Sequence, residues 1–365
     1  MTLLAIRKER RFTRFPIPLE RVAAYTRQHS RQPGHGSKGI LDLILAGLVR
    51  LAGRLSWEQA YQLGHALGML FYRLRIRRRV AMVNLTIAYG DTIGLVEKER
   101  IYRGCLINFG RVIINHLRLP YQGPTFWSMA CRFEQEKQIQ ELFNRQKGVI
   151  FVAGHIGMMD LAGGRLGMSG YPVAAVAKPM KNQAVDGMII RARNAMNVGT
   201  ISHKRSARRI LRGLKNGEGI IMILDQNMKR DQSIFIDWLG YPASATSAAA
   251  FFARKTKSPV IAGYLLQHGP KQFELRISDP IAWEAVPGNG DRELLVNTQR
   301  QADVLQAVIR RHPELWFWIH RRWKVQPEGT AEPYETSRFK AYRKRIRKTV
   351  KRWKRRIAKQ DNKTK

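Results

Sequence analysis

The sequence contains 365 residues, of which 65 are Lys or Arg and 27 are Asp or Glu, giving a formal net charge of +38. A hydrophobic share of 44% suffices for a packed core and excludes a wholly disordered chain. The only cysteines, Cys105 and Cys131, exclude a disulfide framework and a zinc finger. The charge indicates an anionic partner, which can be nucleic acid, anionic lipid or a phosphorylated substrate.

The chain begins with a basic segment. Residues 1–38 are predicted to form a leader, and no apolar signal-peptide segment directly follows its first basic residues. The apolar run 39–55 is interrupted by Asp42, Arg50 and Arg54, so its uninterrupted part is shorter than the roughly 20 residues of a spanning helix. It predicts a helix in the membrane interface or partly inserted, or alternatively a core helix. Whether this segment spans or lies on a membrane stays open.

Residues 39–147 are predicted to form a helical membrane-associating region. Ser56 and Gln59 have the spacing of a capping box, which predicts that a helix begins there. That helix ends in a cluster of five arginines within residues 73–79.

From residue 148 the pattern changes to alternating strands and helices, which predicts an α/β fold with a central mixed, mostly parallel sheet flanked by helices. Residues 148–328 are assigned to this α/β domain, which is expected to be the catalytic domain. The predicted strands are 148–153, 171–178, 200–202, 219–225, 259–267 and 272–278. The predicted helices are 158–169, 182–196, 204–215, 246–257 and 292–311.

The last segment, 329–365, is predicted to be a polybasic tail. From residue 338 onward, about half of its residues are Lys or Arg. Apolar residues recur there at intervals of three and four, which predicts a C-terminal basic amphipathic helix for an anionic membrane surface. A solvated tail or a nucleic-acid-binding arm is the alternative.

The main candidate for chemistry is the segment 154–160, Gly-His-Ile-Gly-Met-Met-Asp, which follows the first buried strand. Its spacing lets the Asp160 carboxylate meet the His155 imidazole and fix its tautomer, so that the other ring nitrogen can take a proton from a hydroxyl. Gly154 and Gly157 remove side chains where substrate and backbone approach each other. By itself, a histidine and an aspartate at this spacing are a weak signal.

Six blocks together resemble the late acyltransferases of lipid A biosynthesis, within the lysophospholipid and glycerophosphate acyltransferase superfamily. The resemblance covers residues 40 to 325. The blocks are 78–85 (RRVAMVNL), 154–160, 178–182 (KPMKN), 225–226 (DQ), 240–246 (GYPASAT) and 313–324 (PELWFWIHRRWK).

This resemblance implies transfer of a fatty acyl chain from a thioester to a hydroxyl of a lipid A precursor or related glycolipid, at the cytoplasmic face of a bacterial inner membrane. The donor is expected to be acyl carrier protein or acyl-CoA, and the acceptor an anionic glycolipid. His155 is carried over as general base and Asp160 as its orienting partner. No metal, no redox cofactor and no nucleic acid are expected.

Further residues are expected to bind substrate. Backbone N–H groups near Gly157, or an arginine, can stabilise the oxyanion. Arg193 is expected to contact a phosphate or the oxyanion, with Arg191 beside it. Asp225 and Gln226 are expected to position the acceptor or support the site. Arg321 and Arg322 are expected to contact phosphate.

The chain departs from the family pattern and leaves alternatives open. Met158-Met159-Asp160 stands where members often have Asn-Trp-Glu, and the polybasic tail is unexpected; both put the exact acceptor in doubt. A lysophospholipid or another lipid is the alternative acceptor. A basic nucleic-acid-binding protein is a further alternative, although no RNP motif or zinc finger supports it. An esterase would need a Gly-x-Ser-x-Gly elbow, which the sequence lacks.

Overall fold

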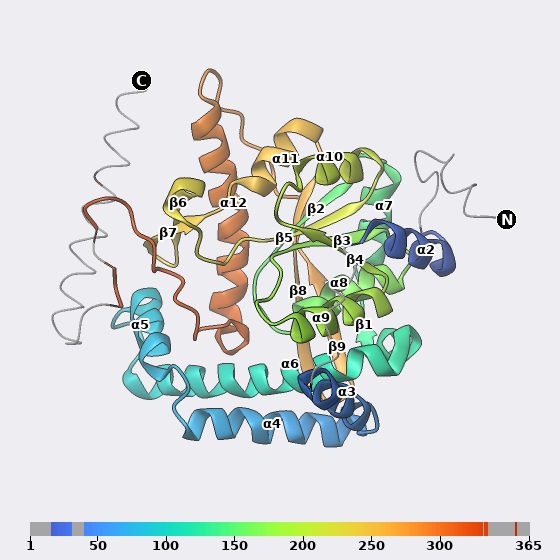
Figure 1. Ribbon diagram of the computed structural model, residues 1–365. Helices are drawn as coiled ribbons and strands as arrows, with labels where there is room; N and C mark the ends of the chain where they lie inside the picture. Colours follow the sequence, from blue (N-terminus) through green and yellow to red (C-terminus); the bar gives the residue numbers. More distant parts are fainter. Residues whose placement is uncertain (1–15, 31–39, 331, 335–354, 356–365) are drawn as a thin grey trace.

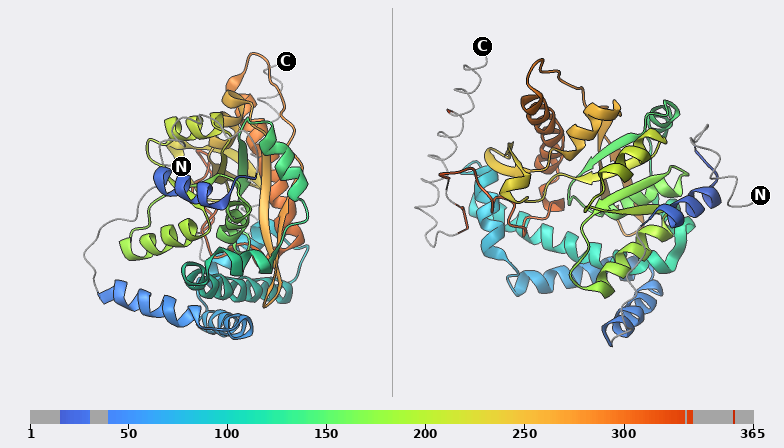
Figure 2. Two further views of the ribbon diagram at one scale, coloured as in Figure 1. Left: turned by 90° about the vertical axis from the view of Figure 1, so that its right-hand side faces the viewer. Right: turned by 45° about the horizontal axis from the view of Figure 1, so that its top comes forward.

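The computed structural model describes residues 16–30, 40–330, 332–334 and 355. Within them, a central sheet of seven strands has the order β1-β9-β8-β2-β5-β3-β4, with helices on both of its faces (Figure 1, Figure 2). Its strands are β1 (Cys131–Arg132), β2 (Val149–Ala153), β3 (Val173–Ala177), β4 (Val198–Ser202), β5 (Gly219–Ile223), β8 (Val260–Gly269) and β9 (Gln272–Ile277).

Strands β8, β2, β5, β3 and β4 run parallel, and β9 pairs antiparallel with β8. All six predicted strands are present, and the predicted mostly parallel α/β sheet is confirmed. Because β2 and β5 are parallel neighbours that pair Ala153 with Ile223, the residues that follow both strands lie at one edge of the sheet.

Alternate residues of β2 enter two different cores. Ile150 and Val152 face a cluster with the helices α10 (Ala207–Lys215), α11 (Ala248–Thr256) and α12 (Gly290–Arg311). Val149 and Phe151 face the other side. The helices that contribute to that second core are α7 (Glu136–Asn144), α8 (Met159–Met168) and α9 (Gln183–Ala195). This two-residue alternation explains why β2 is apolar throughout.

In the predicted helical region 39–147, four of the five helices run along one side of the molecule (Figure 1). They are α3 (Ile40–Gly53), α4 (Trp57–Arg73), α5 (Arg78–Tyr89) and the long α6 (Leu95–Ala130), which is kinked at Gly123. The predicted capping box is confirmed, because Ser56 Oγ accepts from the Gln59 N–H and the Gln59 side chain accepts from the Ser56 N–H. Among the described residues, no helix is long and apolar enough to cross a membrane.

Close packing joins α4 to α6 through glycines. A Cβ added to Gly110 would lie 2.2 Å from the Gly64 carbonyl oxygen and 2.6 Å from the Gly68 nitrogen. The two helix backbones are therefore in direct contact, and α4 is fixed against a helix that also packs on α8 and α9.

Part of the predicted leader belongs to the folded body. Residues 19–29 form α2 (Leu19–His29), in which Val22 is fully buried. Thr26 Oγ1 donates to the Asn197 carbonyl, and Ser30 Oγ accepts from the Thr200 N–H of the edge strand β4. Residues 16–30 are therefore attached to the edge of the sheet by these bonds. The predicted tail helix lies outside the described residues, apart from Arg355.

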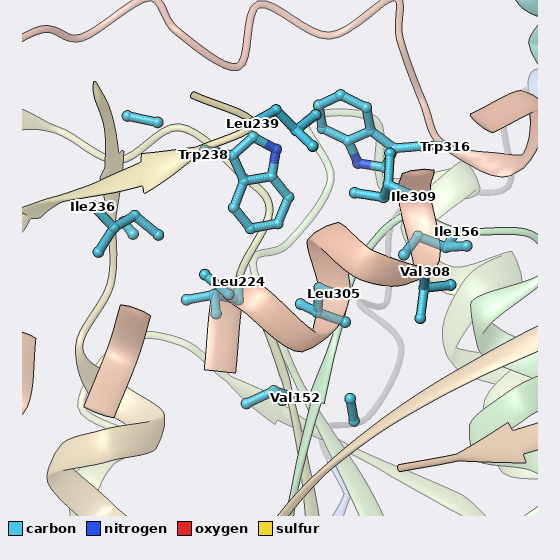
Figure 3. Close-up of a cluster of buried hydrophobic side chains, with 14 of the residues drawn as sticks. Val152, Ile156, Leu224, Ile236, Trp238, Leu239, Leu305, Val308, Ile309 and Trp316 are labelled. Atoms are coloured by element: carbon cyan, nitrogen blue, oxygen red, sulfur yellow. The ribbon is translucent and has the colours of Figure 1, made fainter. Parts of the chain in front are cut away.

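A β-hairpin was not predicted. Strands β6 (Ile234–Trp238) and β7 (Tyr241–Ala245) are antiparallel, and Leu239 and Gly240 connect them with φ of 53° and 88°. The block 240–246 is therefore largely a strand. Figure 3 shows the hairpin residues Trp238 and Leu239 packed with α12 and Trp316, in one core with Val152 of β2.

Candidate active site

His155 and Asp225 form a pair at the carboxyl ends of β2 and β5. His155 Nδ1 lies 2.9 Å from Asp225 Oδ1, and the His155 backbone N–H donates to Asp225 Oδ2 at 2.7 Å. Because an ionised carboxylate only accepts, Nδ1 carries a proton and Nε2 is left as the basic nitrogen. The pairing follows from the parallel register of the two strands.

Buried groups hold the Asp225 carboxylate in place. The Trp316 indole N–H donates to Asp225 Oδ2 at 2.8 Å, and Asp225 is only 3% exposed. A Cβ at Gly154 would lie 3.2 Å from the same oxygen, so a glycine lets the chain pass close to the carboxylate. Trp316 was not predicted as a site residue, although it lies in the 313–324 block that carried the resemblance.

The two members of this pair shift each other's protonation. Burial favours the neutral carboxyl, but the charge and hydrogen bonds of His155 outweigh it and lower the pKa of Asp225 to about 2. Burial also favours the neutral imidazole, but Asp225 outweighs it and raises the pKa of His155 above its usual value. The pair is therefore arranged to stabilise an imidazolium beside a carboxylate.

The expected contact between His155 and Asp160 is corrected by the structure. Asp160 Oδ1 accepts from Arg193 Nε at 2.7 Å, and its Oδ2 lies 3.3 Å from Nε2 of His116 on α6. All three side chains are at most 14% exposed. Asp160 lies in the first turn of α8, where its carboxylate meets residues of α6 and α9 instead of His155. The carboxylate that contacts the imidazole is Asp225.

The groups around Asp160 stabilise its ionised carboxylate. Burial would raise the pKa of Asp160, but Arg193 and His116 outweigh it and lower that pKa. Burial lowers the pKa of His116, with Asp160 opposing and Arg193 adding to this effect. The charge of Arg193 also acts on His155, so this second cluster adjoins the first. His116 was not predicted, since it lies in the helical region far from any motif.

Gly157 has a structural role in the turn that follows His155. Its φ is +60°, and an added Cβ would lie 2.3 Å from the Leu265 carbonyl oxygen. Its N–H donates to the Leu315 carbonyl at 3.0 Å. The Gly157 N–H is therefore already used, which corrects its expected availability to an oxyanion.

The other predicted residues divide between the site and its surroundings. Gln226 is exposed, and its Nε2 lies 3.1 Å from His155 Nε2. Arg322 is fully buried over the Trp238 ring, and its Nη1 donates to the Ser244 carbonyl at 2.5 Å and to the Gln226 carbonyl at 3.3 Å. The expected phosphate contact of Arg322 is therefore corrected to support of Gln226.

Two further arginines are at the surface. Arg191 is exposed on α9, in contrast to the buried Arg193 two residues later. Arg321 is exposed, with its guanidinium 5.6 Å from the centre of the Tyr334 ring. The structure thus brings His155, Asp225 and Gln226 together and leaves Arg191 outside this group.

A histidine paired with a buried carboxylate, at the carboxyl edge of a parallel sheet, is an arrangement suited to general-base catalysis. A family model described as bacterial lipid A biosynthesis acyltransferase matches residues 31–325, so the chain belongs to this family. The predicted family and the predicted acyltransferase class are confirmed.

Individual relatives agree with the family match. A lipid A biosynthesis lauroyltransferase of Escherichia coli K12 is 23% identical over 297 residues, which cover 79% of this chain and 92% of that protein. A palmitoleoyltransferase of the same organism is 24% identical over 190 residues, covering 52% and 60%. Lipid A biosynthesis acyltransferase 2 of Shigella flexneri is 19% identical over 294 residues, covering 80% and 86%.

Proposed function

We propose that the protein moves a fatty acyl chain from a thioester to a hydroxyl of a lipid A precursor, with His155 as general base oriented by Asp225. The observation that carries this proposal is the 2.9 Å contact between His155 Nδ1 and Asp225 Oδ1. That contact leaves Nε2 free of its own proton and ready to accept one.

The reaction needs no covalent acyl-enzyme. His155 Nε2 takes the proton of the acceptor hydroxyl as its oxygen bonds to the thioester carbonyl carbon. The resulting oxyanion collapses, the carbon–sulfur bond breaks, and the imidazolium returns the proton to the departing thiolate. Asp225 stabilises the imidazolium during this sequence. The Gln226 amide lies 3.1 Å from Nε2, so it is close enough to contact the acceptor hydroxyl in the proposed reaction.

We assign the buried ion pair of Asp160 and Arg193 to the oxyanion side of the site. Asp160 fixes the guanidinium through Arg193 Nε at 2.7 Å, and the charge of Arg193 reaches His155. A fixed positive charge beside the reacting centre favours a developing oxyanion without reorganisation.

The donor is proposed to be acyl carrier protein or acyl-CoA, both of which are anionic. Exposed cationic residues lie on α10 and in the loop before it: Lys204, Arg205, Arg208, Arg212 and Lys215. Such a surface favours the approach of an acidic donor.

A membrane surface is the proposed place of action, at the cytoplasmic face of the inner membrane. Leu43, Ile44, Leu48 and Leu51 of α3 are between 44% and 67% exposed. An exposed aliphatic stripe on one helix fits the outer part of a lipid layer.

Mass spectrometry of lipid extracts tests the proposal. Cells lacking the protein are compared with cells restored with wild type or with His155→Ala. The expected result is one glycolipid that lacks one acyl chain and regains it only with wild type. Restoration by His155→Ala would contradict the mechanism, and an unchanged glycolipid profile, with loss from a phospholipid instead, would assign a different acceptor.

A further inference from the structure

The turn between α4 and α5 concentrates cationic side chains at the surface. Together with the last residue of α4 and the first two of α5, the turn forms the segment 73–79, in which five of seven residues are arginines. Arg78 pairs with Glu99 at 2.6 Å. Arg73, Arg75 and Arg77 are exposed, and their side chains make no hydrogen bond or ion pair within the described residues. Three guanidinium groups are thus available to a ligand.

Exposed aliphatic side chains alternate with these arginines. Leu70 is 49% exposed, Leu74 is 62% exposed and Ile76 is 37% exposed. A turn that presents cationic and aliphatic groups together suits the boundary between lipid headgroups and acyl chains. A soluble polyanion would not account for the aliphatic residues.

The backbone of the turn holds two of the arginines in an unusual conformation. Arg75 has φ of 53° and Arg77 has φ of 51°, in the left-handed region that favours glycine. Glycine would adopt this conformation with less strain but would supply no charge. Arginines at these two strained positions are therefore consistent with a function for their guanidinium groups.

Helix α5, which follows the turn, contacts the segment after α12 that contains Trp316, the donor to Asp225. Asn84 Nδ2 of α5 donates to the Trp318 carbonyl at 2.6 Å and to the His320 carbonyl at 2.7 Å. Arg79 Nη2 donates to the Tyr334 carbonyl at 3.2 Å, and Arg321 lies over the ring of the same tyrosine. Figure 1 shows α5 next to the segment that follows α12.

The charge of Arg77 reaches the catalytic edge. The pKa of His320 is lowered to about 4, first by burial and then with contributions from His155 and Arg77. His320 is therefore within the fields of both the catalytic histidine and the turn.

We propose that Arg75 and Arg77, with Arg321 on the adjoining segment, bind a phosphate on the headgroup of the acceptor lipid. The inference rests on the proposed function and names the part of the acceptor that the turn recognises. Guanidinium groups match phosphate oxygens in paired hydrogen bonds. Leu74 and Ile76 lie in the outer acyl region, so the turn sets the depth at which the acceptor hydroxyl meets His155.

The test compares Arg75→Ala/Arg77→Ala with Arg145→Ala/Lys255→Ala, a control that removes two exposed cationic side chains outside the turn. Kinetics are measured with the phosphorylated acceptor and with the same acceptor after removal of its phosphate. In the turn variant, KM for the phosphorylated acceptor is expected to rise about tenfold or more, with kcat nearly unchanged. The control variant is expected to match wild type.

The dephosphorylated acceptor separates phosphate recognition from general membrane attraction. Wild type and the turn variant are expected to have equal KM values for the dephosphorylated acceptor, because neither protein can then bind a phosphate through Arg75 and Arg77. An equal rise in KM with both acceptors would refute phosphate recognition and assign the turn to bulk anionic lipid. An unchanged KM with the phosphorylated acceptor would refute the site altogether.

Binding to an inactive protein separates the site from the proposed function. His155→Ala is mixed with detergent micelles that carry the phosphorylated acceptor, and its binding is compared with that of the triple variant that also lacks Arg75 and Arg77. Weaker binding by the triple variant supports the site even if wild type shows no acyl transfer, which would refute only the function. Equal binding by the two proteins overturns the site.

Discussion

At the scale of single residues, the assignment of Asp225 over Asp160 can be tested directly. Asp225→Asn keeps the size of the side chain but disturbs the tautomer of His155, so kcat is expected to fall by about 10³- to 10⁴-fold. Steady-state kinetics measure this loss. Asp279→Asn, at an exposed carboxylate after β9, serves as the control and is expected to retain wild-type kcat. A small loss in Asp225→Asn would contradict the orienting role of Asp225.

The raised pKa of His155 predicts a pH dependence. A general base must be unprotonated, so kcat/KM is expected to rise with pH, with a midpoint above the usual histidine value of about 6.5. Because the Asp225 carboxylate causes this rise, the residual activity of Asp225→Asn is expected to have its midpoint at lower pH. A pH profile of both proteins measures the two midpoints, and identical midpoints would contradict the pairing.

The buried ion pair of Asp160 and Arg193 predicts a loss of stability. Asp160→Asn leaves the Arg193 guanidinium buried without a compensating charge, and the free energy of unfolding is expected to fall by about 3 kcal/mol. Urea denaturation measures this loss. Glu284→Gln breaks the exposed pair with Arg300 and is expected to cost at most about 1 kcal/mol. Equal losses in the two variants would contradict the expected cost of leaving Arg193 buried without its partner charge.

At the scale of elements, the contact between α4 and α6 depends on glycine. A side chain at Gly110 cannot fit beside the backbone of Gly64 and Gly68, so Gly110→Ala is expected to lower the free energy of unfolding by about 1–3 kcal/mol. Gly47→Ala in α3 has open space and is expected to be neutral or stabilising by up to about 1 kcal/mol. Thermal unfolding of the two variants compares them, and equal midpoints would contradict the close packing.

The elements that could be predicted from the sequence are those whose pattern lies within a few neighbouring residues. The strand β2 is a continuous apolar run, and the capping box at Ser56 and Gln59 lies within four residues, so both could be predicted. The hairpin β6–β7 could not, because Leu239 takes a left-handed conformation and Pro242 lies inside β7. Leucine and proline at those positions carry none of the usual signals of a hairpin.

The residues of the candidate site could be chosen from their motifs, but their pairing could not. Asp225 was expected to position the acceptor or support the site, whereas it lies 70 residues from His155 in sequence and is brought to it by the pairing of β2 with β5. The order of strands in a sheet does not follow from local periodicity. For the same reason, the contacts of Asp160 with His116 and Arg193 were not foreseen.

At the scale of the whole molecule, two parts of the chain are proposed to act on a membrane. Helix α3, which carries the exposed aliphatic stripe, lies next to α4 on one side of the molecule (Figure 1), and the polybasic tail lies outside the described residues. Apolar attraction depends little on salt, and attraction between a net charge of +38 and anionic lipid is screened by it. Salt therefore distinguishes the two contributions.

Vesicle sedimentation with Leu43→Asn/Leu51→Asn tests the α3 surface. Both leucines are more than 60% exposed, and their replacement is expected to weaken binding to anionic vesicles about tenfold at high as well as low salt. Leu19→Asn, at an exposed leucine of α2 beside the sheet edge, is the matched control and is expected to bind as wild type does. Deletion of residues 338–365 is expected to weaken binding at low salt and to make little difference at high salt, where the charges are screened. If the leucine variant instead binds normally at both salt concentrations, α3 does not contact the lipid layer, and membrane attachment must come from another part of the chain.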